Sequence, residues 1–138
     1  MASNMNQQAT GTFEVSLNPL ELNESGENET RSRMSINKRF DGDLQATSVG
    51  EMLTGMTAMK GSAGYVAMER VSGTLHGREG SFLLQHSGTM DRGEPTLVVS
   101  VVPDSGTGQL EGLAGTLAIA IREGIHHYTF DYRFASEP

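Results

Sequence analysis

The feature of this sequence that most restricts its fold is the short, regular spacing of its turn signals. Glycines grouped with charged or polar residues recur along the chain, at 41–42, 77–80, 91–93, 103–106 and 123–124. Short runs of strand-forming residues lie between them, and this spacing is typical of an all-β sandwich or barrel. Methionines recur at helix-like intervals over 50–60, but Gly50 and Gly55 disfavour a long helix there. We therefore expect an all-β fold.

Within these runs apolar and polar residues alternate, as they do in strands that bury one face. In the first run, Phe13, Val15 and Leu17 share one face, opposite Glu14 and Ser16. About eight strands joined in sequential hairpins predict a closed antiparallel eight-stranded β-barrel, whose interior suits side chains or one small ligand. A two-sheet sandwich is the alternative. The runs lie at 12–17, 33–40, 43–54, 63–75, 81–90, 97–102, 113–122 and 125–134.

Length and local composition predict one domain with a loose start. The 138 residues fit a single domain. Residues 1–8 form a polar stretch that we interpret as a disordered tail, so the barrel is expected at 9–135. The stretch 18–31 is polar and acidic, with little to bury. We expect it to be a loop after the first strand, either a solvated linker or a lid over the barrel mouth.

Composition and charge exclude several classes of function. The chain has no cysteine, which excludes a disulfide, a thiolate metal site and a cysteine nucleophile. Its formal net charge of −7 disfavours nucleic acids and anionic membrane surfaces as partners. The beginning of the sequence lacks the features of a signal peptide, and no apolar run approaches the roughly 20 residues that span a bilayer. A cytoplasmic location is therefore expected.

The run 97–102 is apolar on both of its faces. A strand in a single-layer barrel turns only one face to the core, so the other face needs a cover. A second subunit is the simplest cover, and we expect a homo-oligomer; the alternative is a cover formed by the chain's own ends or long loop. The expected contact residues are Leu97, Val98, Val99, Val101 and Val102.

Three ionisable residues occupy positions where the alternation calls for an apolar side chain. Lys38 lies between Ile36 and Phe40, and Glu69 and His86 interrupt the apolar faces of two consecutive strands. Glu69 and His86 are nearly equidistant from the predicted turn at 77–80, so we expect them to be cross-strand neighbours. Buried charges need partners, and a carboxylate beside a histidine is a plausible acid–base pair. Glu69 and His86 are therefore the candidate catalytic residues.

Ser48, Tyr65 and Tyr128 share apolar faces and carry hydroxyl groups that suit a ligand oxygen. Together with Lys38, Glu69 and His86 they form the predicted ligand-binding set. A purely structural ion pair is the alternative role for the charged residues. No cofactor or metal is expected, because the adjacent His126 and His127 point to opposite faces of a strand and no other spacing suits a metal.

Several segments resemble a known family. The runs 61–90 and 101–116, with the segment 127–132, resemble a bacterial family of small proteins of unknown function that is grouped with the allene oxide cyclase-like barrels. The resemblance covers roughly residues 10–134. It implies a barrel like those that hold a reactive apolar molecule while it cyclises or couples. The pocket cysteine of the plant cyclases has no counterpart here, and none of their catalytic motifs is matched.

Three functions fit these observations. The first is a binding module that holds an apolar or amphipathic metabolite in the barrel lumen. The second is a cofactor-independent cyclase or isomerase in which Glu69 and His86 move a proton. The third is a structural or interaction protein with a filled barrel. An open lumen favours the first two, and a packed lumen favours the third.

Overall fold

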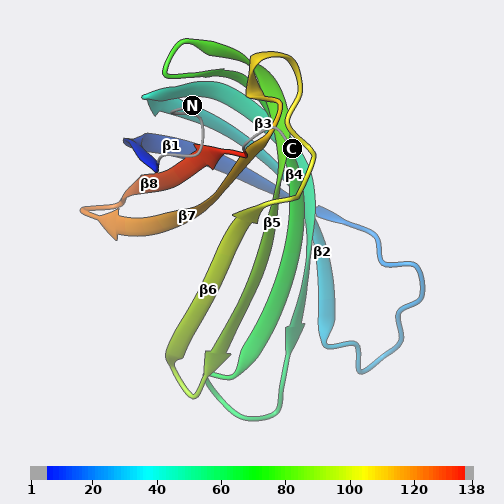
Figure 1. The fold of residues 1–138 in the computed structure, drawn as a ribbon. Helices are drawn as coiled ribbons and strands as arrows, with labels where there is room; N and C mark the ends of the chain where they lie inside the picture. The colour runs from blue at the N-terminus through cyan, green and yellow to red at the C-terminus, as the bar shows by residue number, and fades with distance from the viewer. Residues whose placement is uncertain (1–5, 136–138) are drawn as a thin grey trace.

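The computed structural model describes residues 6–135, and these form a closed antiparallel barrel of strands β1 to β8 in sequence order (Figure 1). Each strand pairs with the next, and β8 closes the barrel on β1. The eight-stranded barrel predicted from the alternation is confirmed. A short 3₁₀ helix, η2 (Gly108–Leu110), lies between β6 and β7. The strands are β1 (Gln7–Leu20), β2 (Arg31–Gly42), β3 (Leu44–Met56), β4 (Ala63–Leu75), β5 (Arg78–Asp91), β6 (Glu94–Val101), β7 (Leu113–Arg122) and β8 (Ile125–Phe134).

The segment boundaries differ from the sequence prediction at both sides of β1. This strand begins at Gln7, whose partner in β8 is Tyr132, so the end of the predicted tail belongs to the barrel. Residues 1–5 of that tail lie outside the described residues. Because β1 continues to Leu20 and β2 begins at Arg31, the acidic loop is confined to 21–30.

The turn between β4 and β5 sets the register of the candidate site. It consists of His76 and Gly77, with φ values of 47° and 81°, a left-handed pair that suits a two-residue hairpin. The sequence prediction placed this turn at 77–80. It missed the register because positive φ is uncommon outside glycine, so the turn was assigned to begin at Gly77 and not at His76. In the observed register Glu69 pairs with Leu84, and His86 pairs with Ala67.

One half of the barrel interior is filled. This half, which we call the closed end, carries the β2–β3 turn, the β4–β5 turn and η2. Large apolar side chains pack there from all sides, and each of those given at the end of this paragraph is at most 5% exposed. Aromatic contacts run through it, such as Phe82 stacked on Phe130 with ring centroids 5.8 Å apart. The set includes Leu44, Leu75, Phe82, Leu110, Leu113, Phe130 and Phe134.

The other half of the interior is not filled. We call it the open end; it carries the loops 21–30 and 57–62 and the turns at 92–93 and 123–124. By strand alternation Leu17, Leu97 and Ile121 point toward the interior there, yet they are 44%, 42% and 64% exposed. The barrel therefore has a packed half and an apolar half that is open to solvent.

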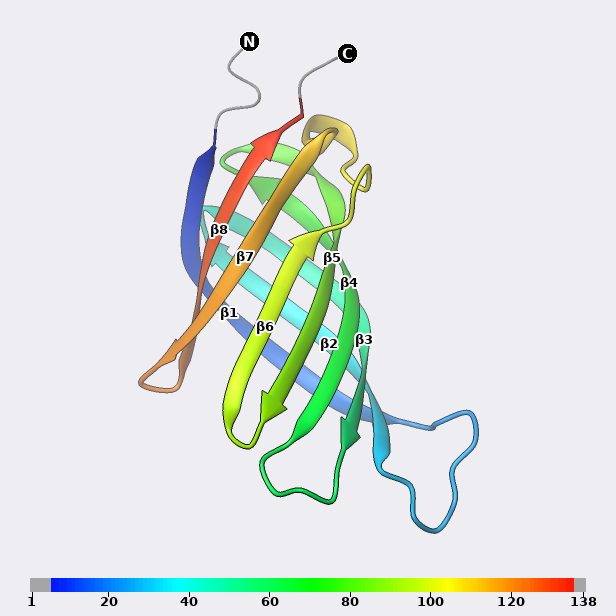
Figure 2. The ribbon, with the colours of Figure 1, turned by 60° about the horizontal axis from the view of Figure 1, so that its bottom comes forward.

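The strand β6 explains part of this opening. It pairs with β5 through eight residue pairs but with β7 through a single pair, Ser100 with Thr116. Figure 2 shows β6 and β7 close together near this pair and diverging toward the open end.

The same strand corrects the predicted subunit contact. Val99 and Val101 are 2% and 7% exposed and face the interior, and Leu97 shares their face. Only Val98 and Val102 point outward, and Val98 is 54% exposed. Self-association through this strand rests on these two side chains and stays a prediction. Among residues 6–135 there is no helix that is long and apolar enough to cross a membrane.

Candidate functional site

Four side chains from four consecutive strands meet on the inner wall of the barrel, where three of them contact the carboxylate of the fourth. They are Lys38 of β2, Ser48 of β3, Glu69 of β4 and His86 of β5, which we call the Glu69 cluster. Lys38 Nζ lies 2.8 Å from Glu69 Oε2, and Ser48 Oγ donates to Glu69 Oε1 at 2.6 Å. His86 Nε2 lies 2.5 Å from Glu69 Oε2. The structure thus brings together four residues of the predicted ligand-binding set.

The register of the strands explains this convergence. Lys38 and Ser48 are directly opposed in neighbouring strands, whereas Glu69 lies opposite Gly50. A Cβ atom at Gly50 would lie 2.7 Å from the Cβ of Glu69, so a side chain there would push Glu69 away. The glycine lets Glu69 lean across β3 toward Ser48 and Lys38. The sequence predicted that His86 and Glu69 are cross-strand neighbours. They are not directly opposed: His86 lies diagonally from Glu69 and still reaches its carboxylate.

The cluster is almost completely buried. Glu69 is 1%, Ser48 3% and His86 4% exposed, and the Lys38 side chain is 7% exposed. Burial by itself raises the pKa of Glu69. The hydrogen bond from His86, the charge and hydrogen bond of Lys38 and the hydrogen bond from Ser48 outweigh burial, and they lower this pKa to about 2. Glu69 is therefore ionised at neutral pH.

The ionised carboxylate determines the tautomer of His86. An ionised carboxylate only accepts hydrogen bonds, so His86 Nε2 carries the proton and donates it. None of the described residues forms a hydrogen bond with the other ring nitrogen, Nδ1. Among the described residues, no buried side-chain nitrogen or oxygen lacks a partner, so Nδ1, which has none, is not completely buried. His86 therefore presents a free nitrogen beside an ionised carboxylate.

A cavity of about 360 Å³ lies in the mouth of the open end. Tyr65 forms one of its walls, and its ring lies over Gly88, where a Cβ atom would come within 2.5 Å of Tyr65 Cε1. The ring centroids of Tyr65 and His86 are 6.5 Å apart. Burial, and secondly the charge of Glu69, raises the pKa of Tyr65, so its hydroxyl remains a neutral donor. The other lining residues include Thr54, Met56, Ala63, Met90 and Leu97.

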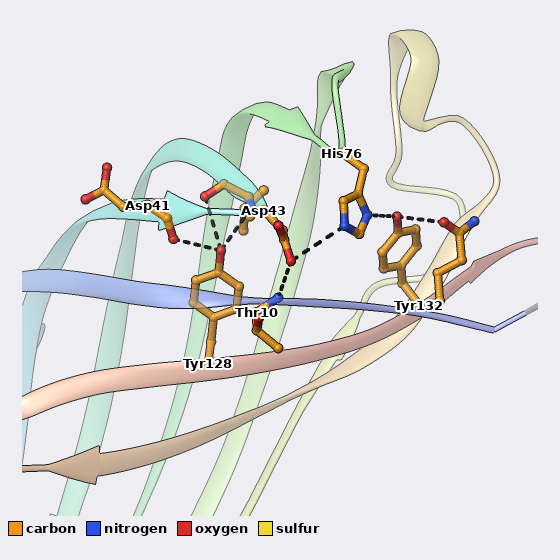
Figure 3. A network of polar contacts seen from close by, with 8 residues as sticks. Thr10, Asp41, Asp43, His76, Tyr128 and Tyr132 are labelled. Carbon is orange, nitrogen blue, oxygen red and sulfur yellow. Dashed lines mark hydrogen bonds and ion pairs between the residues drawn. The ribbon is translucent and has the colours of Figure 1, made fainter.

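The hydroxyl of Tyr128 bonds the backbone at the closed end of the barrel. Its hydroxyl accepts a hydrogen bond from the backbone N–H of Leu44 at 2.9 Å and donates to the backbone oxygen of Asp41 at 2.9 Å (Figure 3). These bonds hold the β2–β3 turn against β8 and occupy the hydroxyl. Tyr128 therefore has a structural role at the closed end, and its predicted contact with a ligand stays a prediction.

A second polar network was not predicted from the sequence. At the closed end, His76 Nδ1 lies 2.5 Å from the hydroxyl of Tyr132, and His76 Nε2 lies 3.6 Å from Asp43 Oδ2 (Figure 3). Asp43 also accepts the backbone N–H of Thr10 at 2.9 Å. The network joins β1, β8 and two turns that lie far apart in the sequence. No local pattern indicates it, since His76 occurs in a turn.

A larger hollow, of about 720 Å³, lies on the outer wall beside the 21–30 loop. Its lining includes Leu53, Val66 and Met68, whose side chains point outward. Arg33 on this wall donates to the backbone oxygen of Glu21 at 2.9 Å, and Arg31 donates to that of Glu24 at 2.6 Å. These bonds tie the first part of the loop to the outside of the barrel. Within residues 6–135, no three histidine or carboxylate side chains are grouped to bind a metal.

Comparison with known proteins supports the fold and the family. Residues 9–132 match the family model DUF3224, described as a protein of unknown function. The chain belongs to the DUF3224 family. It is also similar to the crystal structure of a DUF3224 protein of unknown function from Shewanella oneidensis MR-1, with 48% identity and a TM-score of 0.89 over 95% of this chain and 99% of that one. No functionally curated protein matches this chain.

Proposed function

We propose that this DUF3224 barrel binds a small, neutral, largely apolar molecule in its open half. The polar group of the ligand contacts Tyr65 and His86. The observation that supports this most directly is the place of the Glu69 cluster: a buried ionisable group lies on the inner wall of a lumen that is open and apolar on one side.

The exposed apolar side chains of the open end support a ligand of apolar character. Leu17, Leu97 and Ile121 point inward but remain in contact with water. Exposed apolar surface that is gathered in a concave site is typical of a binding site. A ligand that covers these side chains gains about 25 cal/mol for each Å² of apolar surface removed from water.

The charges of the site support a neutral ligand. Lys38 and Glu69 form an ion pair at 2.8 Å, so their charges compensate each other. A ligand carboxylate would meet the ionised Glu69, and the chain as a whole carries a net charge of −7. A carbonyl or hydroxyl group accepts or donates hydrogen bonds there without introducing an unpaired charge.

Fluorescence titration with N-phenyl-1-naphthylamine tests this proposal. The probe is neutral and apolar, and its emission rises in an apolar site. Leu97 and Val98 offer a matched pair, because they are neighbours on opposite faces of β6. We expect Leu97→Glu to weaken binding by about tenfold or more, which corresponds to about 1.4 kcal/mol, and Val98→Glu to leave it unchanged. Absence of binding to the unmodified protein, or equal loss in both variants, contradicts a site in the lumen.

The resemblance to allene oxide cyclase-like barrels agrees with this proposal, since those barrels hold an apolar molecule in their interior. That wider grouping stays a prediction from the sequence, as does the cytoplasmic location.

A further inference from the structure

We propose that the Glu69 cluster is an acid–base site that moves a proton within a bound neutral ketone. The substrate class is a small β,γ-unsaturated ketone, and the product is its conjugated α,β-unsaturated isomer. This inference rests on the proposed function, because the ketone has to bind in the open half of the barrel. His86 and Tyr65 are the candidate catalytic residues, and Glu69 is a positioning residue.

The two histidine networks of this protein differ in a way that points to His86. His76 uses both ring nitrogens for contacts within the protein, one with Tyr132 and one with Asp43. His86 uses only Nε2, which bonds Glu69, and its Nδ1 remains accessible. A histidine that only stabilises a fold has no need of a ring nitrogen without a partner. The free nitrogen of a neutral imidazole is a base.

The proton transfer needs no other reactant. His86 Nδ1 removes a proton from the carbon between the carbonyl and the double bond. The electrons of that C–H bond move into the conjugated dienolate, and the negative charge gathers on the carbonyl oxygen. The imidazolium then returns the proton to the γ-carbon, which forms the new C–H bond and restores neutral His86. No atom is gained or lost, and nothing is oxidised or reduced.

Glu69 stabilises the charged state of His86 during this transfer. Its carboxylate lies 2.5 Å from His86 Nε2, and it is held in place by Lys38 and Ser48. An ionised carboxylate in this position orients the imidazole and stabilises the imidazolium. Glu69 does not itself contact the substrate in this scheme.

Tyr65 is placed to stabilise the dienolate oxygen. Tyr65 pairs with Gly88, and Ala67 pairs with His86. On the inner face these two pairs follow each other, and the pair of Tyr65 lies nearer the open end. The ring centroids of Tyr65 and His86 are 6.5 Å apart, so the two side chains are close enough to contact one small ligand. A neutral hydroxyl that donates to a developing oxyanion lowers the barrier to enolate formation.

Isomerisation of cyclohex-3-enone to cyclohex-2-enone, followed by ultraviolet absorbance of the conjugated product, tests the inference. We expect the unmodified protein to accelerate the reaction over buffer, and His86→Gln to lower kcat by about 100-fold. His127→Gln is the matched control, since His127 lies on the outer face of β8, and it is expected to keep the full rate. Glu69→Gln is expected to lower kcat and leave KM unchanged, which a purely structural role would not do.

Urea unfolding shows whether each variant is folded. If His86→Gln is not folded, Tyr65→Phe carries the test, with an expected fall of about tenfold in kcat. The inference is overturned if the ketone displaces the probe but is not isomerised, or if folded His86→Gln or Tyr65→Phe keeps the full rate; ligand binding then still stands. If the ketone does not displace a bound probe, the inference fails alone, and if the probe does not bind, the proposed function fails as well.

Discussion

His86 Nε2 lies 2.5 Å from Glu69 Oε2, although the two residues belong to different cross-strand pairs. The contact is diagonal across β4 and β5, and on the other side of β4 the gap at Gly50 lets the same carboxylate reach Ser48 and Lys38. This contact connects the stability of the barrel with its proposed activity, since the same carboxylate holds Lys38, Ser48 and His86.

The acid stability of the protein is expected to depend on Glu69. Its pKa is lowered from 4.5 to about 2 in the folded protein. A lowered folded-state pKa contributes stability that is fully present above pH 4.5 and is lost as the pH falls toward 2. Urea unfolding between these pH values is expected to show a falling free energy of unfolding, with a shallower fall in Glu69→Gln. Equal slopes in the two proteins would show that Glu69 titrates normally.

Loss of the Glu69 side chain is expected to destabilise the fold strongly. Glu69→Ala leaves Lys38 buried without its carboxylate, and breaking a buried ion pair typically costs on the order of 3 kcal/mol. Urea unfolding at neutral pH measures this. Glu51→Ala is the control, because the ion pair of Glu51 with Arg33 is exposed and contributes about 1 kcal/mol or less. A cost near zero for Glu69→Ala contradicts its place in the cluster.

Tyr128→Phe is expected to cost more stability than Tyr65→Phe. The first change leaves the buried backbone N–H of Leu44 without its partner, which costs about 1–3 kcal/mol. The hydroxyl of Tyr65 has no bond to any described residue, so its loss is expected to change stability by less than about 0.5 kcal/mol. Thermal or urea unfolding of the two variants compares them. Equal costs would contradict the clamp between β8 and the β2–β3 turn.

The tyrosines are expected to ionise at unusually high pH. The chain has three of them, and burial is the main cause that raises the pKa of each above 10.0. Tyrosinate absorbance is therefore expected to appear only above this pH. Glu69→Gln removes a charge that raises the pKa of Tyr65, so Tyr65 alone is expected to titrate earlier in that variant. Tyr65→Phe identifies its share of the signal, and an unchanged titration in Glu69→Gln would place Tyr65 away from the cluster.

Much of the fold was predictable because strand alternation is a local property. The inward positions of Lys38, Glu69 and His86 follow from it, and so does their burial near one another. The register was missed by two residues, because the turn places His76 at positive φ instead of beginning at Gly77. The convergence of Lys38, Glu69 and His86 with Ser48 depends on the gap at Gly50. This gap can be recognised only once the pairing of β3 with β4 is known.

The remaining features depend on how the sheet closes. The occupied hydroxyl of Tyr128 and the contact of His76 with Tyr132 both join segments that are distant in the sequence. Part of the opening follows from the single residue pair between β6 and β7. Alternation does not distinguish the two faces of 97–102, because both are apolar, and it does not show that Leu97 remains exposed to water on the inner face.

The most direct test of a ligand site in the lumen is a nuclear magnetic resonance titration of protein labelled with ¹³C at its methionine methyl groups. Met52 and Met90 point toward the interior of the open end, whereas Met68 points outward into the hollow on the outer wall. On addition of N-phenyl-1-naphthylamine, we predict that the methyl signals of Met52 and Met90 shift and that the signal of Met68 does not. A shift of Met68 alone would place the ligand on the outer wall and contradict a binding site inside the barrel.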